Sequence, residues 1–368
     1  MKNFFLIVFS TIFTIFFLYL IVFFNTHKNL ANEFKYSFKS TVDLDFHEKY
    51  SKKLHHIRDT STVSESFKKV ETEDLLFTRI NQENKKDLTV LFQGDSWMEM
   101  MVYPAEPEFI SVNAIKKAKS LKKIHFINSG TASYSPSLMS IQLDVLEKDF
   151  GIIPDILIAY IDQTDIGDEN CRYKHKKIYQ NSTLIGVEPE FYHSNRSIFN
   201  YAKIYGLSRI NLADYSDSMK SFMLINYKIK YKLIRLFKKN KRVKCYYSEL
   251  EKYLINPEKK SIQYFEESLT EYLEKIKKKK KIKKIFLVTF PHKKHFKNFY
   301  SYNVSTSVDK LSKSNKTFSH INFSKKLLND KKFEYENIWW RDQIHLNFFN
   351  YRELFLNPIL KELDAYIN

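Results

Sequence analysis

The chain has 368 residues, which is enough for one large core or for a core with a substantial insertion. Its 60 lysines and arginines outnumber 42 acidic residues, giving a formal net charge of +18. Such a balance favours anionic surroundings such as lipid headgroups, acidic polysaccharide or nucleic acid, although a general lysine-rich composition explains it equally well. The main lysine run, residues 277–284, is a single block without a nucleic-acid-binding motif, so we expect no nucleic-acid partner.

The first stretch in the chain is apolar. Residues Phe4 to Phe24 carry no charge, and a helix of this length would cross a hydrocarbon core of about 30 Å. Lys2 precedes the stretch and no small-residue cleavage site follows it. The pattern predicts a retained transmembrane signal anchor over residues 1–27. The rest of this single-pass protein would then lie on the extracytoplasmic (periplasmic) side of the cytoplasmic membrane.

Residues 28–86 are polar and charged, and they contain few glycines and prolines. Within them, Ser64 to Arg79 has apolar residues at helical spacing. We therefore predict a partly helical stalk over residues 28–86 and a folded domain over residues 87–368.

Buried strands alternate with helices in this domain. Apolar runs of strand length are followed or preceded by turn residues and separated by amphipathic stretches. The predicted strands are Leu88 to Phe92, Ile124 to Asn128, Ile156 to Ile161, Ile285 to Phe290 and His320 to Phe323. The predicted helices are Val112 to Ser120, Pro136 to Phe150 and Phe348 to Ile367. This alternation predicts a doubly wound α/β fold, in which a mostly parallel sheet has helices on both faces.

Residues 165–260 are too long for a simple connection, so we predict a helical insertion there. Its part from Phe222 to Val243 interleaves apolar and basic residues, as in a helix that packs on the domain or rests on anionic lipid. Cys171 and Cys245 lack the spacing of a metal site. They would form one disulfide in an exported protein or remain two thiols.

The residues from Leu88 to Trp97 suggest a nucleophile. An apolar, β-branched run stops at Gly94, and Ser96 follows two residues later. A strand that ends in a tight glycine turn would present Ser96 at the carboxyl edge of the sheet. The bland alternative is that Ser96 only caps the next helix.

Near the carboxyl end, Asp342 and His345 are three residues apart. A carboxylate at this spacing can accept a proton from the imidazole and fix its tautomer, which leaves the other ring nitrogen free to take a serine proton. His292 and His295 follow a predicted strand at the same sheet edge, but the sequence shows no carboxylate partner for them.

Together, Gly94-Asp95-Ser96-Trp97 and Asp342-Gln343-Ile344-His345 resemble the SGNH (GDSL-type) hydrolase family. The resemblance implies a flavodoxin-like three-layer sandwich in which Ser96 is the nucleophile, His345 the base and Asp342 its orienting group. It also implies an oxyanion hole formed by Ser96, Gly130 and the residue at position 164. The family has Gly-x-Asn-Asp after its third strand, whereas this chain has Asp162-Gln163-Thr164-Asp165. Thr164 would be a shorter donor than asparagine, and Gln163 is the alternative.

The resemblance further implies a serine esterase or O-acyltransferase that acts on acyl esters of carbohydrate, with acetyl as the expected acyl group. Such chemistry needs no metal or organic cofactor. The alternative is a catalytically inactive member of the fold that binds polysaccharide or scaffolds a cell-envelope assembly. The departures at Asp162 and Thr164 favour the alternative, and the retained Ser96, Asp342 and His345 favour the enzyme.

Overall fold

The structure is a computed structural model that describes residues 5–20, 44–58, 72–80, 88–102, 124–189, 245, 247–313 and 315–368. The predicted helices Val112 to Ser120 and Phe222 to Val243 lie outside these residues.

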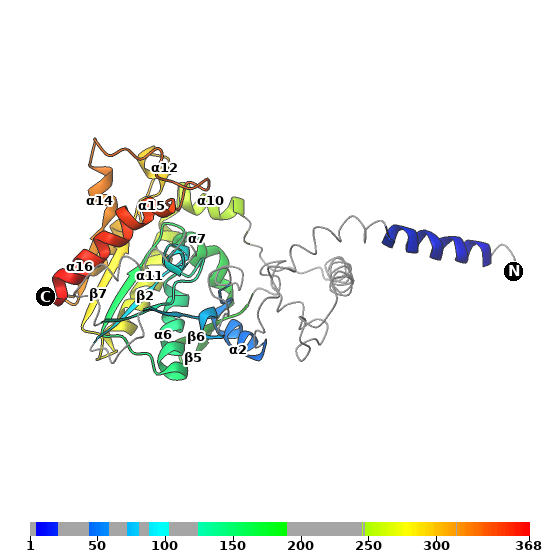
Figure 1. Ribbon diagram of the computed structural model, residues 1–368, viewed down its shortest axis with the longest axis horizontal. Coiled ribbons are helices and arrows are strands. Elements are labelled where there is room, and N and C mark those ends of the chain that lie inside the picture. The colour runs from blue at the N-terminus through cyan, green and yellow to red at the C-terminus, as the bar shows by residue number, and fades with distance from the viewer. Residues whose placement is uncertain are drawn as a thin grey trace.

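A six-stranded sheet runs through the domain (Figure 1), in the order β1-β3-β2-β4-β7-β8. Its strands are β1 (Thr78–Ile80), β2 (Leu88–Gln93), β3 (Ile124–Asn128), β4 (Ile156–Tyr160), β7 (Lys284–Thr289) and β8 (Phe318–Asn322). Strand β1 is antiparallel to β3, and all the other neighbours are parallel. Numbered from β2, the five parallel strands follow the flavodoxin-like order 2-1-3-4-5. The predicted doubly wound, mostly parallel sheet is therefore confirmed.

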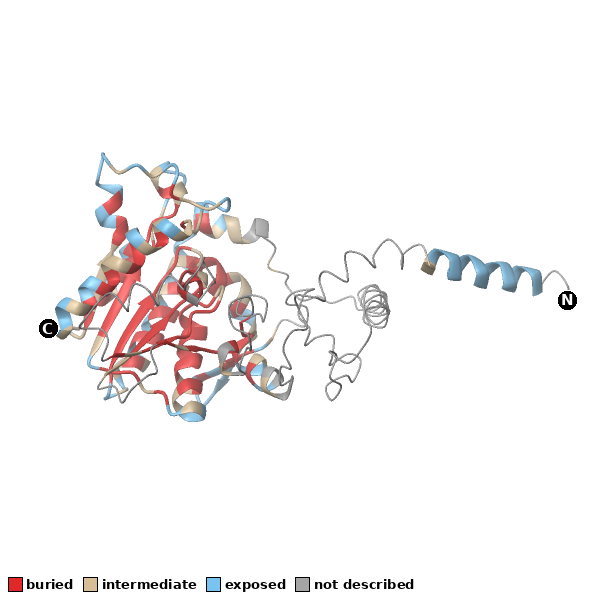
Figure 2. Cartoon of the chain, in the orientation of Figure 1, coloured by how far each residue is buried: buried red, intermediate tan, exposed pale blue. Residues whose placement is uncertain are grey.

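Two apolar cores lie on opposite faces of the sheet because successive strand residues point to opposite sides (Figure 2). On β2, for example, Leu91 belongs to one core, and Val90 and Phe92 belong to the other. The first core is covered by α2 (Leu44–Leu54), α6 (Pro136–Phe150), α11 (Lys259–Lys277) and α13 (Ser305–Ser312). The second core is covered by α4 (Ser96–Glu99), α14 (Phe323–Leu328) and α16 (Asn357–Ile367).

Two predicted helices are found near their expected bounds. Helix α6 begins at Pro136 and ends at Phe150, and the next residue, Gly151, has a left-handed backbone (φ 66°) and caps the helix by donating its N–H to the Glu147 carbonyl. The carboxyl-terminal helix spans the predicted range but is interrupted. It consists of α15 (Phe348–Asn350), a π-helix (Tyr351–Leu356) and α16.

The predicted stalk needs correction. Helix α2 and strand β1 both lie within residues 28–86, and they are part of the domain. Tyr50 and Leu54 of α2 are buried in the first core, together with Phe77 beside β1. The helix predicted from Ser64 to Arg79 is wrong over residues 72–79, where the chain forms a short 3-10 helix (Thr72–Leu75) and then enters β1. Residues 64–71 lie outside the described part of the chain.

Residues 5–20 form a helix with mostly exposed side chains (Figure 2). None of the helices in the described part of the chain is long and apolar enough to cross a membrane. The rest of the predicted anchor, residues 1–4 and 21–27, lies outside that part.

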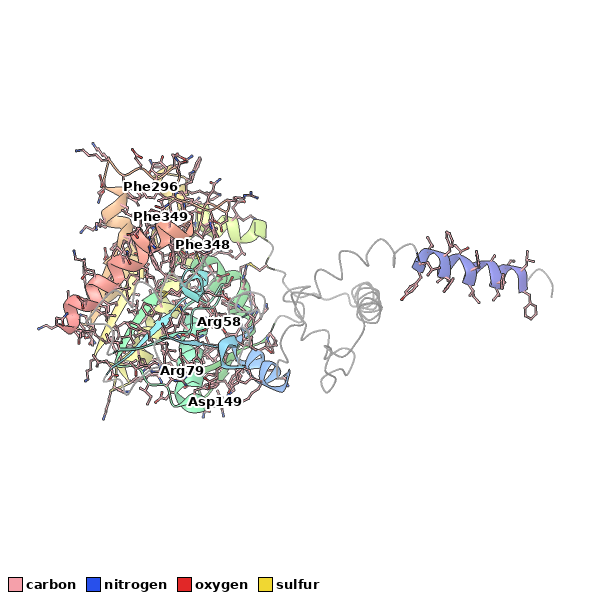
Figure 3. All side chains as sticks on the ribbon, in the orientation of Figure 1. Arg58, Arg79, Asp149, Phe296, Phe348 and Phe349 are labelled. Carbon is pink, nitrogen blue, oxygen red and sulfur yellow. A yellow bond between two sulfur atoms is a disulfide. The ribbon has the colours of Figure 1, made fainter. Side chains whose placement is uncertain are left out.

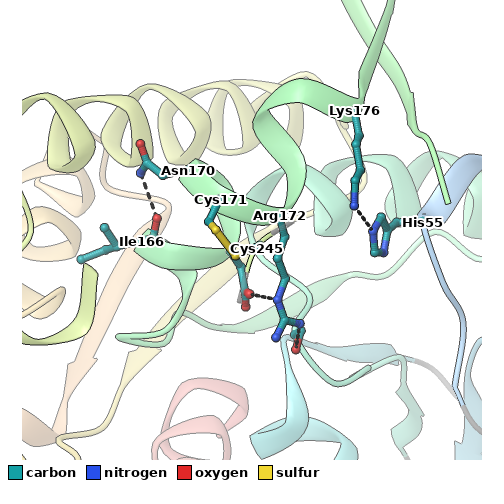
Figure 4. The surroundings of a disulfide bond; sticks show 9 residues. His55, Ile166, Asn170, Cys171, Arg172, Lys176 and Cys245 are labelled. Atoms are coloured by element: carbon teal, nitrogen blue, oxygen red, sulfur yellow. Dashed lines mark hydrogen bonds and ion pairs between the residues drawn. A yellow bond between two sulfur atoms is a disulfide. The ribbon is translucent and has the colours of Figure 1, made fainter. Parts of the chain in front are cut away.

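The described part of the insertion packs against the first core. It contains a π-helix (Asp168–Tyr173), a hairpin of β5 (Lys177–Gln180) and β6 (Thr183–Val187), α10 (Tyr247–Ile255) and the start of α11. Cys171 in the π-helix and Cys245 before α10 form a disulfide (Figure 4). Of the two alternatives for the cysteines, the structure therefore contains the bridge.

Candidate active site

Ser96 lies in the tight turn that the sequence predicts. Strand β2 ends at Gln93, and Ser96 is the first residue of α4, which the Asp95 carboxylate caps by accepting a hydrogen bond from the Trp97 N–H at 2.9 Å. Gly94 has φ 155°, and a Cβ there would come within 3.0 Å of Met98 Cγ and Tyr160 Cβ. A larger residue would therefore be strained at this φ and would crowd Met98 of α4 and Tyr160 of β4.

His345 and Asp342 meet Ser96 from the other end of the chain. The Ser96 Oγ lies 2.6 Å from His345 Nε2, and His345 Nδ1 lies 2.6 Å from Asp342 Oδ2. The second carboxylate oxygen, Oδ1, accepts the N–H groups of Ile344 at 2.9 Å and His345 at 3.0 Å. The structure thus brings the three predicted catalytic residues into one hydrogen-bonded chain.

The Asp342 carboxylate determines which ring nitrogen of His345 carries the proton. Partial burial opposes ionisation of Asp342, but the hydrogen bonds from the His345 ring and from backbone N–H groups outweigh it and lower its pKa to about 2. Because a carboxylate only accepts hydrogen bonds, His345 Nδ1 must carry the proton that faces it. Nε2 is then free to accept the Ser96 hydroxyl proton, as a general base must.

Aromatic rings hold this arrangement. Trp97 is fully buried, and its ring lies 5.0 Å from Phe290 and 6.0 Å from His345. On the outer side, Trp340 lies 6.4 Å from His345 and 4.9 Å from Phe348. The histidine therefore has one buried and one partly exposed aromatic neighbour.

The oxyanion donors implied by the resemblance are not supported beyond Ser96. The Gly130 N–H donates to Asn128 Oδ1 at 2.8 Å. The Thr164 hydroxyl and N–H both donate to Asp162 Oδ2, at 2.5 and 3.0 Å. Gln163 Nε2 donates to the Tyr302 carbonyl at 3.0 Å. Ser96 differs from these three, because its N–H makes no hydrogen bond to any described residue.

A second aspartate–histidine pair lies beneath the site, and the sequence did not indicate it. His292 Nε2 lies 2.8 Å from Asp162 Oδ1, and the two side chains are 0% and 1% exposed. Burial opposes the charge of Asp162, but the nearby His292 and the hydrogen bonds from His292 and Thr164 outweigh it and lower the pKa of Asp162. The expectation that His292 lacks a carboxylate partner is therefore wrong. This pair stabilises the loop in which Asp162 takes the place of the family glycine, and neither side chain reaches solvent.

A third pair has the same order of groups as the Ser96 site. Asp309 Oδ1 lies 2.5 Å from His320 Nδ1, and His320 Nε2 lies 2.8 Å from Thr289 Oγ1. Thr289 is fully buried in β7, so no acyl group can reach its hydroxyl. Of the three pairs, the Ser96–His345–Asp342 chain combines a hydroxyl that is not fully buried with a histidine fixed by a carboxylate.

The sequence matches no known protein family and no curated protein. Similar solved structures include an acetylxylan esterase from Geobacillus stearothermophilus, with 12% identity and a TM-score of 0.36 over 76% of this chain and 94% of that one. A putative platelet activating factor from Streptococcus pneumonia has 12% identity and a TM-score of 0.38, over 78% and 87% of the two chains. LAE5, an alpha/beta hydrolase from the Lake Arreo metagenome, has 9% identity and a TM-score of 0.38, over 77% and 98%. These scores are too low to support an argument about function, which therefore rests on the geometry of the site.

Proposed function

We propose that the protein is a serine esterase or O-acyltransferase. The observation that carries this proposal is the continuous chain from Ser96 Oγ through His345 to Asp342, with 2.6 Å at both contacts of the imidazole. A hydroxyl bonded to a neutral imidazole, itself oriented by a carboxylate, is the arrangement that activates serine for acyl transfer.

In this mechanism Ser96 Oγ attacks the acyl carbon while its proton passes to His345 Nε2. The resulting imidazolium is stabilised by the Asp342 carboxylate, and the Ser96 N–H donates to the developing oxyanion. His345 then protonates the departing alkoxide, which leaves an acyl group on Ser96. Water or a second hydroxyl, activated by the same histidine, removes the acyl group and restores the enzyme.

We propose acetylated carbohydrate as the substrate class. The family resemblance implies such esters, and aromatic side chains beside the site fit the apolar face of a sugar ring. Trp340 lies next to His345 and contacts Phe348, and Phe349, the next residue in the chain, is 65% exposed. An exposed aromatic ring on the segment that follows the catalytic histidine offers an apolar face on which a sugar can stack.

We also propose that the domain is exported and held at the cytoplasmic membrane by the apolar residues Phe4 to Phe24. The Cys171–Cys245 disulfide supports an oxidising compartment. Membranes washed with high salt and then with carbonate should retain the full-length protein. Its release by salt alone would mean that attachment is only peripheral.

The test of the enzymatic proposal is turnover of short-chain p-nitrophenyl esters and acetylated oligosaccharides by the full-length protein. Wild type should release acetate and Ser96→Ala should not, with circular dichroism confirming that both are folded. Equal turnover by Ser96→Ala would exclude the serine mechanism.

The second candidate is an inactive member of the fold that binds polysaccharide or scaffolds an envelope assembly. The Gly130 N–H and the Thr164 hydroxyl already donate to Asn128 and Asp162. This favours the second candidate, because an esterase needs donors aimed at the oxyanion. Binding of polysaccharide by wild type and by Ser96→Ala alike, without turnover of any ester, would support this candidate instead.

A further inference from the structure

A buried arginine from the segment predicted as a stalk lies under the catalytic turn. Arg58 is only 1% exposed. Its Nε donates to the Gly130 carbonyl at 2.7 Å, and its Nη2 donates to both the carbonyl and the Oδ1 of Asn128 at 2.8 Å. Its Nη1 donates to Thr78 Oγ1 at 2.9 Å, which fixes the guanidinium against β1. Arg58 thus binds the start of the loop that follows β3.

That loop in turn holds the helix that carries the nucleophile. Asn128 Nδ2 donates to the Met98 carbonyl of α4 at 2.7 Å, and the Thr131 N–H donates to the Gly94 carbonyl at 3.0 Å. Gly130 packs so closely that a Cβ there would come within 2.5 Å of the Met98 carbonyl carbon and the Glu99 nitrogen. Any shift of residues 128–131 is therefore passed on to α4.

The orientation of Asn128 depends on Arg58. Arginine only donates, so the Asn128 atom that faces it must be the carbonyl oxygen, which leaves the amide nitrogen to donate to Met98. The same Oδ1 accepts the Gly130 N–H. Arg58 and the Gly130 N–H therefore both require the orientation in which Asn128 Nδ2 faces the Met98 carbonyl of α4.

The residues before Arg58 add contacts to the same loop. His56 Nε2 lies 2.7 Å from the Ala132 carbonyl, and the Tyr134 hydroxyl donates to the His56 carbonyl at 2.6 Å. The neighbouring His55 is reached by Lys176 of the insertion at 3.2 Å (Figure 4). The segment from Leu54 to Arg58 is thus bound along its length to the loop and the insertion.

We propose that Arg58 is a positioning residue for Ser96, acting through Asn128 and Gly130. This inference rests on the proposed function, since it assigns Arg58 to the placement of that nucleophile. A displacement of about 1 Å at a reacting atom can cost about 100-fold in rate. Loss of Arg58 is therefore expected to lower kcat much more than it changes KM.

The test compares Arg58→Gln and Arg58→Lys with Arg79→Ala. Arg79 is a matched control because it lies nearby on β1 (Figure 3) but pairs with Glu73 and the Phe77 ring, not with the loop. With p-nitrophenyl acetate, we expect kcat to fall at least tenfold in folded Arg58→Gln, with KM within threefold of wild type. Arg58→Lys should recover part of the loss, because one ammonium can still reach a carbonyl but cannot bridge all four oxygens that the guanidinium contacts. Arg79→Ala should match wild type.

A kcat within twofold of wild type in folded Arg58→Gln would overturn the inference, whereas partial rescue in Arg58→Lys would not. If Arg58→Gln does not fold, the kcat of Arg58→Lys decides by the same twofold limit. Amide hydrogen exchange gives a second measurement that does not need turnover. The exchange rates of the Glu99, Gly130 and Thr131 amides should be higher in Arg58→Lys than in wild type, and those in Arg79→Ala should equal those of wild type. If wild type hydrolyses no ester, the proposed function fails, and equal exchange at these amides in Arg58→Lys and wild type would still refute the role of Arg58.

Discussion

The Cys171–Cys245 disulfide should contribute a large part of the stability of the domain. The bond joins residues 74 positions apart, and chain-entropy arguments give about 4.5 kcal/mol for closing a loop of that length. Replacing both cysteines by serine should lower the free energy of unfolding by about that amount or less, because the unfolded chain retains structure. This is a substantial share of the 5–15 kcal/mol that is usual for a whole protein.

The effect should be on stability more than on the local fold. On either side of Cys171, Arg172 pairs with Asp168 at 3.0 Å, and Asn170 Nδ2 donates to the Ile166 and Ser261 carbonyls at 2.9 Å (Figure 4). These contacts remain in the double serine variant. Below its melting temperature, the variant should therefore keep wild-type turnover.

The assay is urea unfolding followed by circular dichroism, with and without dithiothreitol. Reductant should shift the wild-type midpoint to that of the double serine variant, which itself should not respond. Equal midpoints for wild type and variant under oxidising conditions would refute the reasoning, as would two thiols in native wild type that react with Ellman's reagent.

Four further predictions concern the catalytic site and a buried ion pair. Asp342→Asn should lower kcat by roughly 10³- to 10⁴-fold in steady-state assays, because the amide NH₂ would favour the wrong His345 tautomer. Since the Asp342 pKa is about 2, its carboxylate stays charged at every pH well above that value, so a pH–rate profile should show no step from protonation of Asp342 in the weakly acidic range. Ser96→Ala and His345→Ala should each abolish turnover, and the double variant should be no worse; additive losses would show independent action. Lys177→Met should lower the free energy of unfolding by about 3–5 kcal/mol, because Glu169 would remain buried without the ammonium that now lies 2.8 Å away. The measurement is a urea melt, and an unchanged midpoint would contradict this prediction.

The sequence predicts the parallel sheet and the triad because both depend on local patterns. Strand β4, for example, is an apolar run in which all five residues are buried, and such runs are visible without any knowledge of their neighbours. Asp342 and His345 are three residues apart, so their contact follows from a single turn. Ser96 joins them across 249 positions, and only its place at the carboxyl end of a strand indicated the site.

The remaining contacts join residues that no local pattern relates. Asp162 lies 130 positions from His292, and Arg58 lies 70 positions from Asn128. The prediction that Thr164 is an oxyanion donor is not supported for another reason. Asp162 stands where the SGNH family has glycine, and its carboxylate accepts hydrogen bonds from both the N–H and the hydroxyl of Thr164. Residues 44–58 are mostly polar, so their sequence resembles a linker. Their few apolar residues, including Tyr50 and Leu54, can be recognised as core residues only when the core that they fill is known.

Helix α2 and strand β1 also decide where the chain can be shortened for protein production. Cutting at residue 87, where the sequence places the start of the domain, would remove Tyr50 and Leu54 from the core and Arg58 from beneath the catalytic turn. It would also expose the edge of β3, which β1 covers, and an uncovered edge strand promotes aggregation. A version freed of the helix at residues 5–20 must therefore begin before α2, at residue 43 or earlier, to yield material fit for crystallisation or screening.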